Sequence, residues 1–240
     1  MPAITKVSTD AEALARDTAK WIVERAMAST GRFTLCLSGG STPKALYALL
    51  AQSPYRERMP WDRVHLFWGD ERFVPPEHPD SNFRMANEAM IAHVPIPTNN
   101  VHPFPTDSTP EDCAARYQQS LQSYYGNTTL DPAHPVFDIT LLGLGEDGHT
   151  ASLFPGTAVL NERSAWVAAV IGAKPEPRLT LTYPVLDSSR SVAFLLAGAG
   201  KHAMLTRLLA SDTALPASGV VPVGQLLMLM DRAASEGDAA

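Results

Sequence analysis

The sequence predicts an α/β fold: a Rossmann-like, mostly parallel sheet with helices on both faces. Short apolar runs that are typical of buried strands alternate along the chain with segments of helical periodicity. Glycine-rich or serine-rich turns directly follow several of these runs, as they do in strand–turn–helix units. The 240 residues, 45% of them hydrophobic, suit a single domain over 1–240 whose core needs no disulfide or metal.

The first half of the chain is expected to contain strand–turn–helix units and one proline-rich loop. Thr9 and Glu12 form a capping box that predicts a helix start, and Thr42 with Pro43 fits the cap and first position of a second helix. Residues 93–110 carry five prolines and should form a loop that lies on the core. The other elements expected in this half are a strand at Phe33–Leu37, a helix at 44–51, a strand at Val64–Trp68, and helices at 82–92 and 109–125.

The second half is expected to continue the same alternation. Its most apolar segment, 136–142, predicts a buried strand. The remaining elements expected here are strands at 166–171, 179–183 and 192–197, and helices at 200–210 and 225–234. Strands that alternate with helices in this way imply a parallel sheet covered on both faces.

Composition narrows the classes of function. The only cysteines, Cys36 and Cys113, show no metal-ligand spacing, which favours a reduced, cytoplasmic protein without a metal. No signal-peptide pattern is found, and the longest apolar runs are too short for a bilayer, so no membrane partner is expected. A net charge of −6 disfavours nucleic acid but leaves anionic small molecules open, because a phosphate responds to local donors. A monomer is expected, with an oligomer left open.

Four polar or glycine-rich clusters directly follow predicted strands. They are residues 38–42, 69–72, 143–149 and 198–201. In open parallel sheets, ligands bind beyond the carboxyl ends of the strands. The clusters are therefore expected to converge on one edge of the sheet and to form a substrate site there.

The first cluster has the composition of a phosphate cradle. Gly39 and Gly40 let backbone N–H groups approach an anion, the hydroxyls of Ser38, Ser41 and Thr42 add donors, and a helix N-terminus follows. The segment is not a Walker A loop, since GxxxxGK[ST] is absent. A simple capped turn explains this segment equally well, so both interpretations stay open at this point.

The cluster at 143–149 contains a candidate general base. Its letters match GxGxxG, but Glu146 and Asp147 occupy positions where a dinucleotide pyrophosphate needs donors, so we reject that interpretation. Asp147 and His149 stand two residues apart at a strand end. An imidazole ordinarily titrates near pH 6.5, which suits proton transfer at neutral pH. We favour a catalytic role for this pair over a structural one.

Charged residues of the other clusters are candidates for substrate contacts. Arg72, in the Asp70–Arg72 triplet, can hold a carboxylate or phosphate through paired hydrogen bonds, although a surface charge run is the commoner role of such a triplet. Arg178 begins a predicted strand. Lys201 lies at a helix N-terminus, where a cation is electrostatically unfavourable and a bound anion would explain it.

Taken together, these segments resemble the glucosamine-6-phosphate isomerase/6-phosphogluconolactonase family, and in particular its lactonases. The resemblance rests on LSGGSTP at 37–43, WGDERFVP at 68–75, HPDSN at 78–82, LGLGEDGHTASLFP at 142–155, RLTLTYP at 178–184 and LPAS at 215–218. One departure is Gly219, where lactonases more often carry a bulkier apolar residue.

The resemblance implies hydrolysis of a phosphorylated sugar lactone, 6-phospho-D-glucono-1,5-lactone, without cofactor or metal. It implies that His149 activates water, that residues 38–42, Arg178 and Lys201 surround the phosphate, and that Arg72 positions the substrate. Asp70 matches a residue that moves a carbon proton in the related deaminases. A lactonase has no such proton to move, so a supporting role is expected for Asp70.

Two alternatives remain. Glucosamine-6-phosphate deaminases resemble this chain in the same motifs, but their histidine is followed five residues later by a glutamate, where this chain has Phe154. A non-catalytic sugar-phosphate sensor is the other alternative. The chain leaves no room for a helix-turn-helix module before its first strand-loop motif, and its acidity disfavours DNA.

Overall fold

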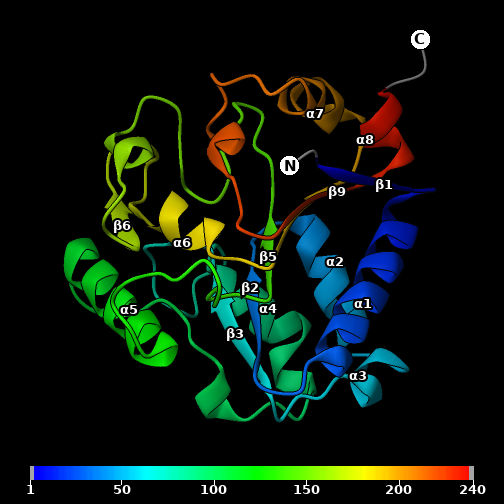
Figure 1. Cartoon of the computed structure of the whole chain (residues 1–240), viewed down its shortest axis with the longest axis horizontal. Coiled ribbons are helices and arrows are strands. Elements are labelled where there is room, and N and C mark those ends of the chain that lie inside the picture. The colour runs from blue at the N-terminus through cyan, green and yellow to red at the C-terminus, as the bar shows by residue number, and fades with distance from the viewer. Residues whose placement is uncertain (1–2, 238–240) are drawn as a thin grey trace.

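The strands form two sheets, which the computed structural model describes for residues 3–237 (Figure 1). The larger sheet is wholly parallel, and the smaller one is antiparallel. In spatial order the larger sheet contains β1 (Ile4–Ser8), β9 (Gln225–Asp231), β8 (Ser191–Leu196), β5 (Ile139–Leu142), β2 (Phe33–Leu37) and β3 (Val64–Trp68). The smaller sheet contains β4 (Asp70–Arg72), β7 (Arg178–Leu181) and β6 (Val167–Val170). The predicted fold class is confirmed.

Eight α-helices connect or flank these strands in the described residues. They are α1 (Ala11–Ala28), α2 (Ser41–Leu50), α3 (Tyr55–Arg58), α4 (Asn82–Ala89), α5 (Pro110–Tyr125), α6 (Tyr183–Asp187), α7 (His202–Leu209) and α8 (Arg232–Glu236). Short 3-10 helices occur at η1 (Ile91–His93), η2 (Thr98–Asn100), η3 (Ala158–Asn161), η4 (Ala199–Lys201) and η5 (Pro216–Gly219). Within residues 3–237, no helix combines the length and the apolar character that a bilayer crossing requires.

The connections reverse direction between β2 and β5. After β2 the chain moves outward to β3, whereas after β5 it moves the other way, to β8 and then β9. Right-handed crossovers therefore place α1 and α2 on one face of the sheet and α5 to α7 on the other. Figure 1 shows α1 and α2 side by side on one flank and α5 beside β6 on the opposite flank. In such a sheet the point of reversal opens a crevice at the carboxyl ends of the two strands.

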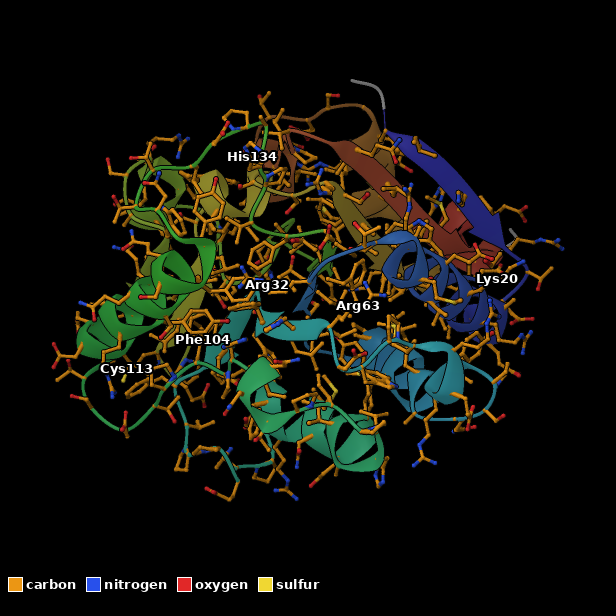
Figure 2. The ribbon with its side chains drawn as sticks, turned by 60° about the horizontal axis from the view of Figure 1, so that its bottom comes forward. Lys20, Arg32, Arg63, Phe104, Cys113 and His134 are labelled. Atoms are coloured by element: carbon orange, nitrogen blue, oxygen red, sulfur yellow. The ribbon has the colours of Figure 1, made fainter. Side chains whose placement is uncertain are left out.

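Three inner strands form the core of the larger sheet. All residues of β2, β5 and β8 are buried, as continuous apolar runs in a doubly covered parallel sheet should be. The loop at 93–110 lies on this core as predicted. Phe104 is 5% exposed, and its ring centroid lies 3.7 Å from that of Tyr117 on α5. Figure 2 labels Phe104 and also Cys113, another buried residue of that helix.

The boundaries at both ends of the chain differ from the expectation. Helix α1 is capped by Asp10, which accepts from Ala13 N at 2.7 Å, so the capping box at Thr9 is wrong. The strand β1 before it was not predicted, because its first four residues are exposed at the sheet edge and carry no apolar periodicity. Similarly, α2 begins after Gly40 rather than after Thr42.

The helix expected at 225–234 is also wrong. Residues Gln225–Asp231 form strand β9, which pairs with β8 on one side and β1 on the other, and only Arg232–Glu236 are helical. The apolar run at 226–230 is equally compatible with a buried helix and with a buried strand. Its leucines and methionines favour helix locally, and pairing on both sides overrides that preference.

The segments at 166–171 and 179–183 form strands, but outside the main sheet. They provide β6 and β7 of the small antiparallel sheet, whose third strand, β4, lies in the cluster 69–72, where no strand was predicted. Register pairs Arg72 with Arg178 across β4 and β7. The small sheet thus brings two arginines that are far apart in sequence to the same end of the molecule.

Two histidines pack together beside β3. Nδ1 of His65 lies 3.2 Å from Nε2 of His102, and the His102 ring stacks on Phe67 at 4.3 Å. Burial, and then the neighbouring His65, lowers the pKa of His102 to about 4. One ring nitrogen donates its proton to the other in this contact, and a second proton between them would be repelled. The folded chain therefore holds both imidazoles in the neutral form.

This pair predicts that the free energy of unfolding decreases as the pH is lowered from about 6.5 to about 4. In that window the unfolded chain binds a proton at residue 102, near the ordinary pKa of about 6.5, and the folded chain does not. Allowing for the ring's partial exposure, the loss at pH 5 relative to pH 7 is about 1 kcal/mol. Urea unfolding at both pH values measures it. His102→Gln should flatten the difference, whereas His134→Gln, at an exposed histidine, should not; equal slopes in both variants would contradict the assignment.

Candidate active site

A cleft of about 310 Å³ lies at the carboxyl ends of β2 and β5. It occupies the point where the connections reverse, as the topology requires. All four predicted clusters contribute to its walls. The lining residues are Ser38, Gly39, Gly40, Ser41, Thr42, Pro43, Asp70, Arg72, Asn82, Gly143, Leu144, Gly145, His149, Thr150, Ala151, Leu195 and Lys201.

The loop at 38–42 is anchored from below by Tyr47. This tyrosine is fully buried, accepts from Ser38 N and donates to Ser38 O, both at 2.9 Å. Burial raises the pKa of Tyr47 well above its usual range, so the hydroxyl remains a donor. On the other side, Gly39 approaches Asn82 so closely that a Cβ would lie 2.6 Å from Cγ of Asn82. Only glycine fits there.

The same loop leaves a helix N-terminus directed at the cleft. Gly40 adopts φ +105°, a conformation that favours glycine, and no side chain caps the first turn of α2. Ser41 and Thr42 line the cleft at this uncapped turn, and their backbone N–H groups lie beyond the reach of the helix's own carbonyls. Such a terminus, with its positive dipole end, suits an anion. The geometry thus favours the cradle over the simple capped turn.

Glu71 holds the neighbouring wall in place. It is 3% exposed, and its carboxylate accepts from Arg72 N and Asn82 N at 2.7 Å and from Phe83 N at 2.8 Å. Ser81 adds its hydroxyl at 3.1 Å. Burial raises the pKa of Glu71, and the backbone donors oppose that shift. The carboxylate thereby ties β4 to the N-terminus of α4, where Asn82 meets the cradle.

Asp70 and Arg72 flank Glu71 and face the cleft. Asp70 accepts from Ser152 Oγ at 2.7 Å, which links β4 to the loop after β5. Nη1 of Arg72 donates to Asp80 O and fixes the arginine along one wall. Successive side chains of β4 point to opposite faces of the strand. Residues 70 and 72 therefore share the face toward the cleft, and residue 71 points to the other face.

Arg178 lies beside the cleft rather than in its lining. Its side chain is 14% exposed, and its nearest carboxylate oxygen, on Glu176, is 3.6 Å from Nη2. Nε and Nη1 have no hydrogen-bond partner among the described residues, although both are buried. Burial and the facing Arg72 lower the pKa of Arg178. A buried guanidinium with two unsatisfied donors is costly on its own, and an anionic ligand would satisfy it.

The loop at 143–149 folds back on itself around two glycines. Gly145 N donates to His149 O at 2.8 Å, and Gly148 adopts φ +80° against Leu215. A Cβ on Gly145 would overlap Nδ1 of His149 and lie 2.9 Å from Oδ1 of Asp147. Gly145 of the GxGxxG match therefore leaves the space that the histidine ring occupies, and Gly148 leaves the space for Leu215.

His149 is held by two neighbours. Asp147 Oδ1 hydrogen-bonds the ring at Nδ1 and accepts from His149 N at 3.1 Å. Partial burial would raise the pKa of Asp147, but the bonds from His149 prevail and lower it, so the carboxylate stays ionised. The ring of Phe154 lies 4.7 Å from the imidazole. With Nδ1 engaged, Nε2 is the nitrogen left for proton transfer.

Lys201 reaches the cleft from the loop after β8. Its Nζ donates to Leu144 O at 2.7 Å. This hydrogen bond explains in part why a lysine lies at a helix N-terminus, where a cation is electrostatically unfavourable. Gly198, at the start of this loop, donates to both carboxylate oxygens of Asp231 at 3.0 Å. Asp231 is 4% exposed and also caps α8. From the cluster 198–201, only Lys201 lines the cleft.

The cleft therefore combines an uncapped helix terminus, three cationic side chains nearby and an oriented imidazole. Within residues 3–237, no group of three or more His, Cys, Asp or Glu side chains is arranged to hold a metal ion. The helix terminus and the cations can bind an anion, and the imidazole can move a proton. That combination suits proton-assisted chemistry on a phosphorylated small molecule.

Comparison with known families agrees with this geometry. A family model described as glucosamine-6-phosphate isomerases/6-phosphogluconolactonase matches residues 9–228. The chain belongs to this family. A 6-phosphogluconolactonase from Nostoc sp. is 44% identical over 217 residues, which cover 88% of this chain and 87% of the relative.

Solved structures of the glucosamine-6-phosphate isomerase/6-phosphogluconolactonase family share the fold. The 6-phosphogluconolactonase of Trypanosoma brucei is 31% identical, with a TM-score of 0.79 and 99% of each chain covered. A monomeric glucosamine-6-phosphate deaminase is 22% identical, with a TM-score of 0.80 and coverage of 97% of this chain and 98% of the other. The two superpose about equally well, so the fold alone does not separate the two activities of the family.

Several residues of the site were not predicted from the family motifs. Glu71 and Asn82 stand inside the motifs but received no role, although strand alternation places Glu71 opposite its two neighbours. Tyr47 and Asp231 lie outside the motifs, and each acts by holding a loop from behind. Their signal is a buried polar side chain, which only the tertiary structure reveals.

The departure at Gly219 also has a structural counterpart. A Cβ at Gly219 would lie 2.7 Å from Cζ of Tyr183, whose hydroxyl donates to Pro216 O at 2.7 Å. The tyrosine ring occupies the space next to residue 219 in this chain. The departure therefore affects packing behind the loop 215–218 and no wall of the cleft.

Proposed function

We propose that this chain hydrolyses 6-phospho-D-glucono-1,5-lactone to 6-phosphogluconate. One observation carries the proposal: His149, oriented by Asp147, lines the same 310 Å³ cleft as the glycine-rich cradle at 38–42. The relatives named 6-phosphogluconolactonase support the same reaction. An anion site facing a general base is what hydrolysis of a phosphorylated lactone needs.

The phosphate is proposed to dock on the cationic wall. The N–H groups at the start of α2, the hydroxyls of Ser38, Ser41 and Thr42, and Lys201 supply donors inside the cleft. Arg178, with two buried donors that lack partners among the described residues, supplies further charge from its position opposite Arg72. Fixing the phosphate places the lactone carbonyl near the imidazole, and such positioning contributes much of the acceleration.

The chemical step is proposed to run through His149. Nε2 takes a proton from water, and the hydroxide formed attacks C1 of the lactone. Arg72 and loop N–H groups stabilise the tetrahedral oxyanion. The bond between C1 and the ring oxygen then breaks, and His149 returns its proton to that oxygen. Asp147 stabilises the imidazolium between these transfers, and no covalent intermediate is needed because a lactone is already a reactive ester.

Asp70 is proposed to support the site instead of acting on the substrate. Its hydrogen bond with Ser152 joins β4, which carries Arg72, to the loop that carries His149. A lactone hydrolysis moves no carbon-bound proton, so no base is needed at this position.

The deaminase alternative is disfavoured by residue 154. In the deaminases that this chain resembles, a glutamate at that position orients the histidine. Here the ring of Phe154 packs at 4.7 Å against His149, so this neighbour provides no carboxylate. Incubation with glucosamine 6-phosphate should accordingly release no ammonia.

Acid release from freshly prepared 6-phosphogluconolactone at neutral pH tests the proposed function directly. The enzyme-dependent rate, corrected for spontaneous hydrolysis, should scale with protein concentration. Binding of 6-phosphogluconate without any acceleration would instead support the sugar-phosphate sensor. Ammonia release from glucosamine 6-phosphate would support the deaminase.

Lys201→Ala should raise KM for the phosphorylated lactone by about tenfold or more, because one charged contact to the phosphate is lost. Turnover of unphosphorylated gluconolactone should stay near that of the unmodified chain, since that substrate makes no such contact. Initial rates with both lactones measure the difference. Arg207→Ala is the matched control: it removes a cation from the following helix, where Asp212 already pairs with it, and both rates should stay unchanged. Equal loss on both substrates in Lys201→Ala would contradict a phosphate contact.

We also propose a cytoplasmic monomer. Cys36 and Cys113 are free and buried, as expected where thiols stay reduced.

A further inference from the structure

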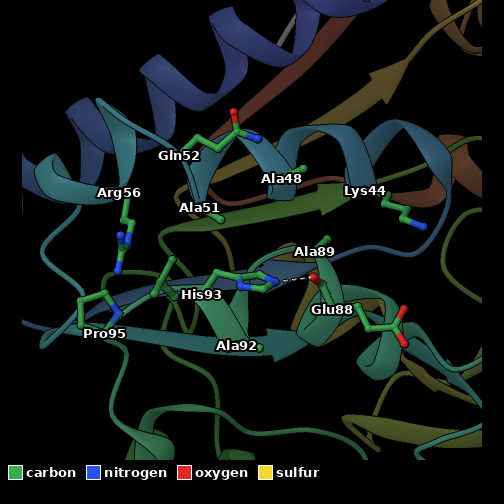
Figure 3. A pocket seen from close by; sticks show the side chains of 11 residues that line it. Lys44, Ala48, Ala51, Gln52, Arg56, Glu88, Ala89, Ala92, His93 and Pro95 are labelled. Atoms are coloured by element: carbon green, nitrogen blue, oxygen red, sulfur yellow. Dashed lines mark hydrogen bonds between the residues drawn. The ribbon is translucent and has the colours of Figure 1, made fainter.

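Two cavities outside the cleft differ in how they relate to the loop that carries His149. An open groove of about 900 Å³ between α2 and the end of α4 contains no residue of that loop (Figure 3). Another cavity, of about 660 Å³, includes Asp147, Phe154 and Lys174 in its lining. Since Asp147 hydrogen-bonds the imidazole, this second cavity adjoins the catalytic pair of the cleft.

The ammonium group of Lys174 contacts an aromatic face in this cavity. Its Nζ lies 5.0 Å from the centroid of the Phe154 ring. Among the described residues, Lys174 takes part in no ion pair and no hydrogen bond, so the ring is the partner of its charge. A cation over an aromatic face is attracted by the negative charge of the π system, and burial of the ring strengthens the attraction. Phe154 is 6% exposed, so this contact restrains both side chains.

The same aromatic ring packs on the imidazole of His149. The centroids of the Phe154 and His149 rings lie 4.7 Å apart, and the ring planes are inclined by 46°. Asp147 hydrogen-bonds the imidazole at Nδ1 alone, and one hydrogen bond does not fix both side-chain torsions of a histidine. The Phe154 ring occupies space next to the imidazole and so limits the rotation that the hydrogen bond permits.

The two segments that meet at this contact are anchored separately. Phe154 follows Ala151, which adopts φ +47°, a left-handed conformation that is rare outside glycine. Such conformations persist only where the surrounding structure requires them. Lys174 lies in the turn between β6 and β7, and Phe73 N donates to Pro177 O at 2.9 Å at the end of that turn. The backbone therefore holds residues 154 and 174 in place on both sides of the contact.

We propose that Lys174 is a positioning residue: its ammonium group holds the Phe154 ring against His149 and thereby keeps Nε2 of the imidazole available to the cleft. The inference rests on the proposed role of His149 in lactone hydrolysis. Neither Lys174 nor Phe154 is among the residues that line the cleft, so neither is expected to contact the substrate. Their effect should therefore appear in kcat and not in KM.

Variants that remove or keep the cation test this role through initial rates with 6-phosphogluconolactone. Lys174→Gln should lower kcat about threefold and leave KM within twofold, because the cation–π contact is lost. Lys174→Arg keeps a cation over the ring and should keep kcat within twofold. Lys20→Gln removes an exposed lysine of α1 and should change neither parameter. An unchanged kcat in Lys174→Gln, or an equal loss in Lys174→Arg, would overturn the proposal.

A double variant tests whether Lys174 acts through the aromatic ring. Phe154→Leu keeps an apolar side chain but removes the aromatic face, and it should lower kcat by more than Lys174→Gln does. Adding Lys174→Gln to Phe154→Leu should cause no further loss, because the ammonium group then has no ring to hold. A full threefold further loss in the double variant would overturn the proposal.

Nuclear Overhauser contacts between the Phe154 and His149 ring protons test the position of the imidazole without catalysis. The contacts should have equal strength in the unmodified chain and in Lys174→Arg, and they should weaken at least about twofold in Lys174→Gln. Contacts of unchanged strength in Lys174→Gln would overturn the proposal, whatever the rates are. Weakened contacts in a protein that hydrolyses no lactone would contradict the proposed function and still support the hold of Lys174 on the ring.

Discussion

His149→Ala should lower kcat for 6-phosphogluconolactone by at least about 10²-fold, the usual scale for loss of a general base. KM should change little, because the proposed phosphate contacts are made by other residues of the cleft. The side chain is only partly buried, at 28% exposure, so its removal should leave the fold intact. Initial rates, corrected for spontaneous hydrolysis, together with a melting curve, separate these effects.

Asp147 extends this test, because it acts through His149. Asp147→Asn should lower kcat by less than His149→Ala does, since the imidazole remains in the cleft. The double variant should be no slower than His149→Ala alone, because residues that act as a unit are not additive. Unchanged turnover in His149→Ala would remove this histidine from the mechanism, and additive losses would separate Asp147 from it.

Gly145→Ala should abolish most activity while leaving the fold largely intact. The new Cβ would overlap the imidazole at Nδ1, so the ring has to leave its position and the bond to Asp147 is lost. The expected loss in kcat approaches that of His149→Ala. The loop lies at the surface of the cleft and the ring can rotate outward, so the melting temperature should fall by only a few degrees, corresponding to about 1 kcal/mol.

Gly143→Ala is the matched control from the same loop. A Cβ at that position would meet only Ser38 Oγ, at an ordinary distance of 3.9 Å. Its kcat should therefore stay within a few-fold of the unmodified chain. Similar kcat values for the two alanine variants would show that the position of the imidazole does not limit turnover.

The convergence of the site was predictable from the sequence because parallel strands share an edge. The clusters after β2, β3, β5 and β8 all follow strand ends, and residues from each of them line the cleft. Phe154 could likewise be identified from the sequence, in the motif at 142–155. Its contact with the imidazole, which disfavours a deaminase, required the coordinates.

Errors arose where local pattern and long-range pairing disagree. The run at 226–230 looks helical in isolation, and β9 exists because β1 and β8 offer hydrogen-bond partners on both sides. β1 is exposed and carries no apolar periodicity, so nothing local predicts it. The small sheet was missed for the same reason: its register, Arg72 opposite Arg178, joins segments more than a hundred residues apart.

The amino-acid sequence by itself determined the fold class, the family and the loops that carry the chemistry, because strand periodicity, glycine turns and motif letters are local properties. Tertiary structure decided which nitrogen of His149 is free and how Glu71, Tyr47 and Asp231 hold the loops. These depend on distances between segments remote in sequence, and burial gives a polar group its partners only once the chain has folded.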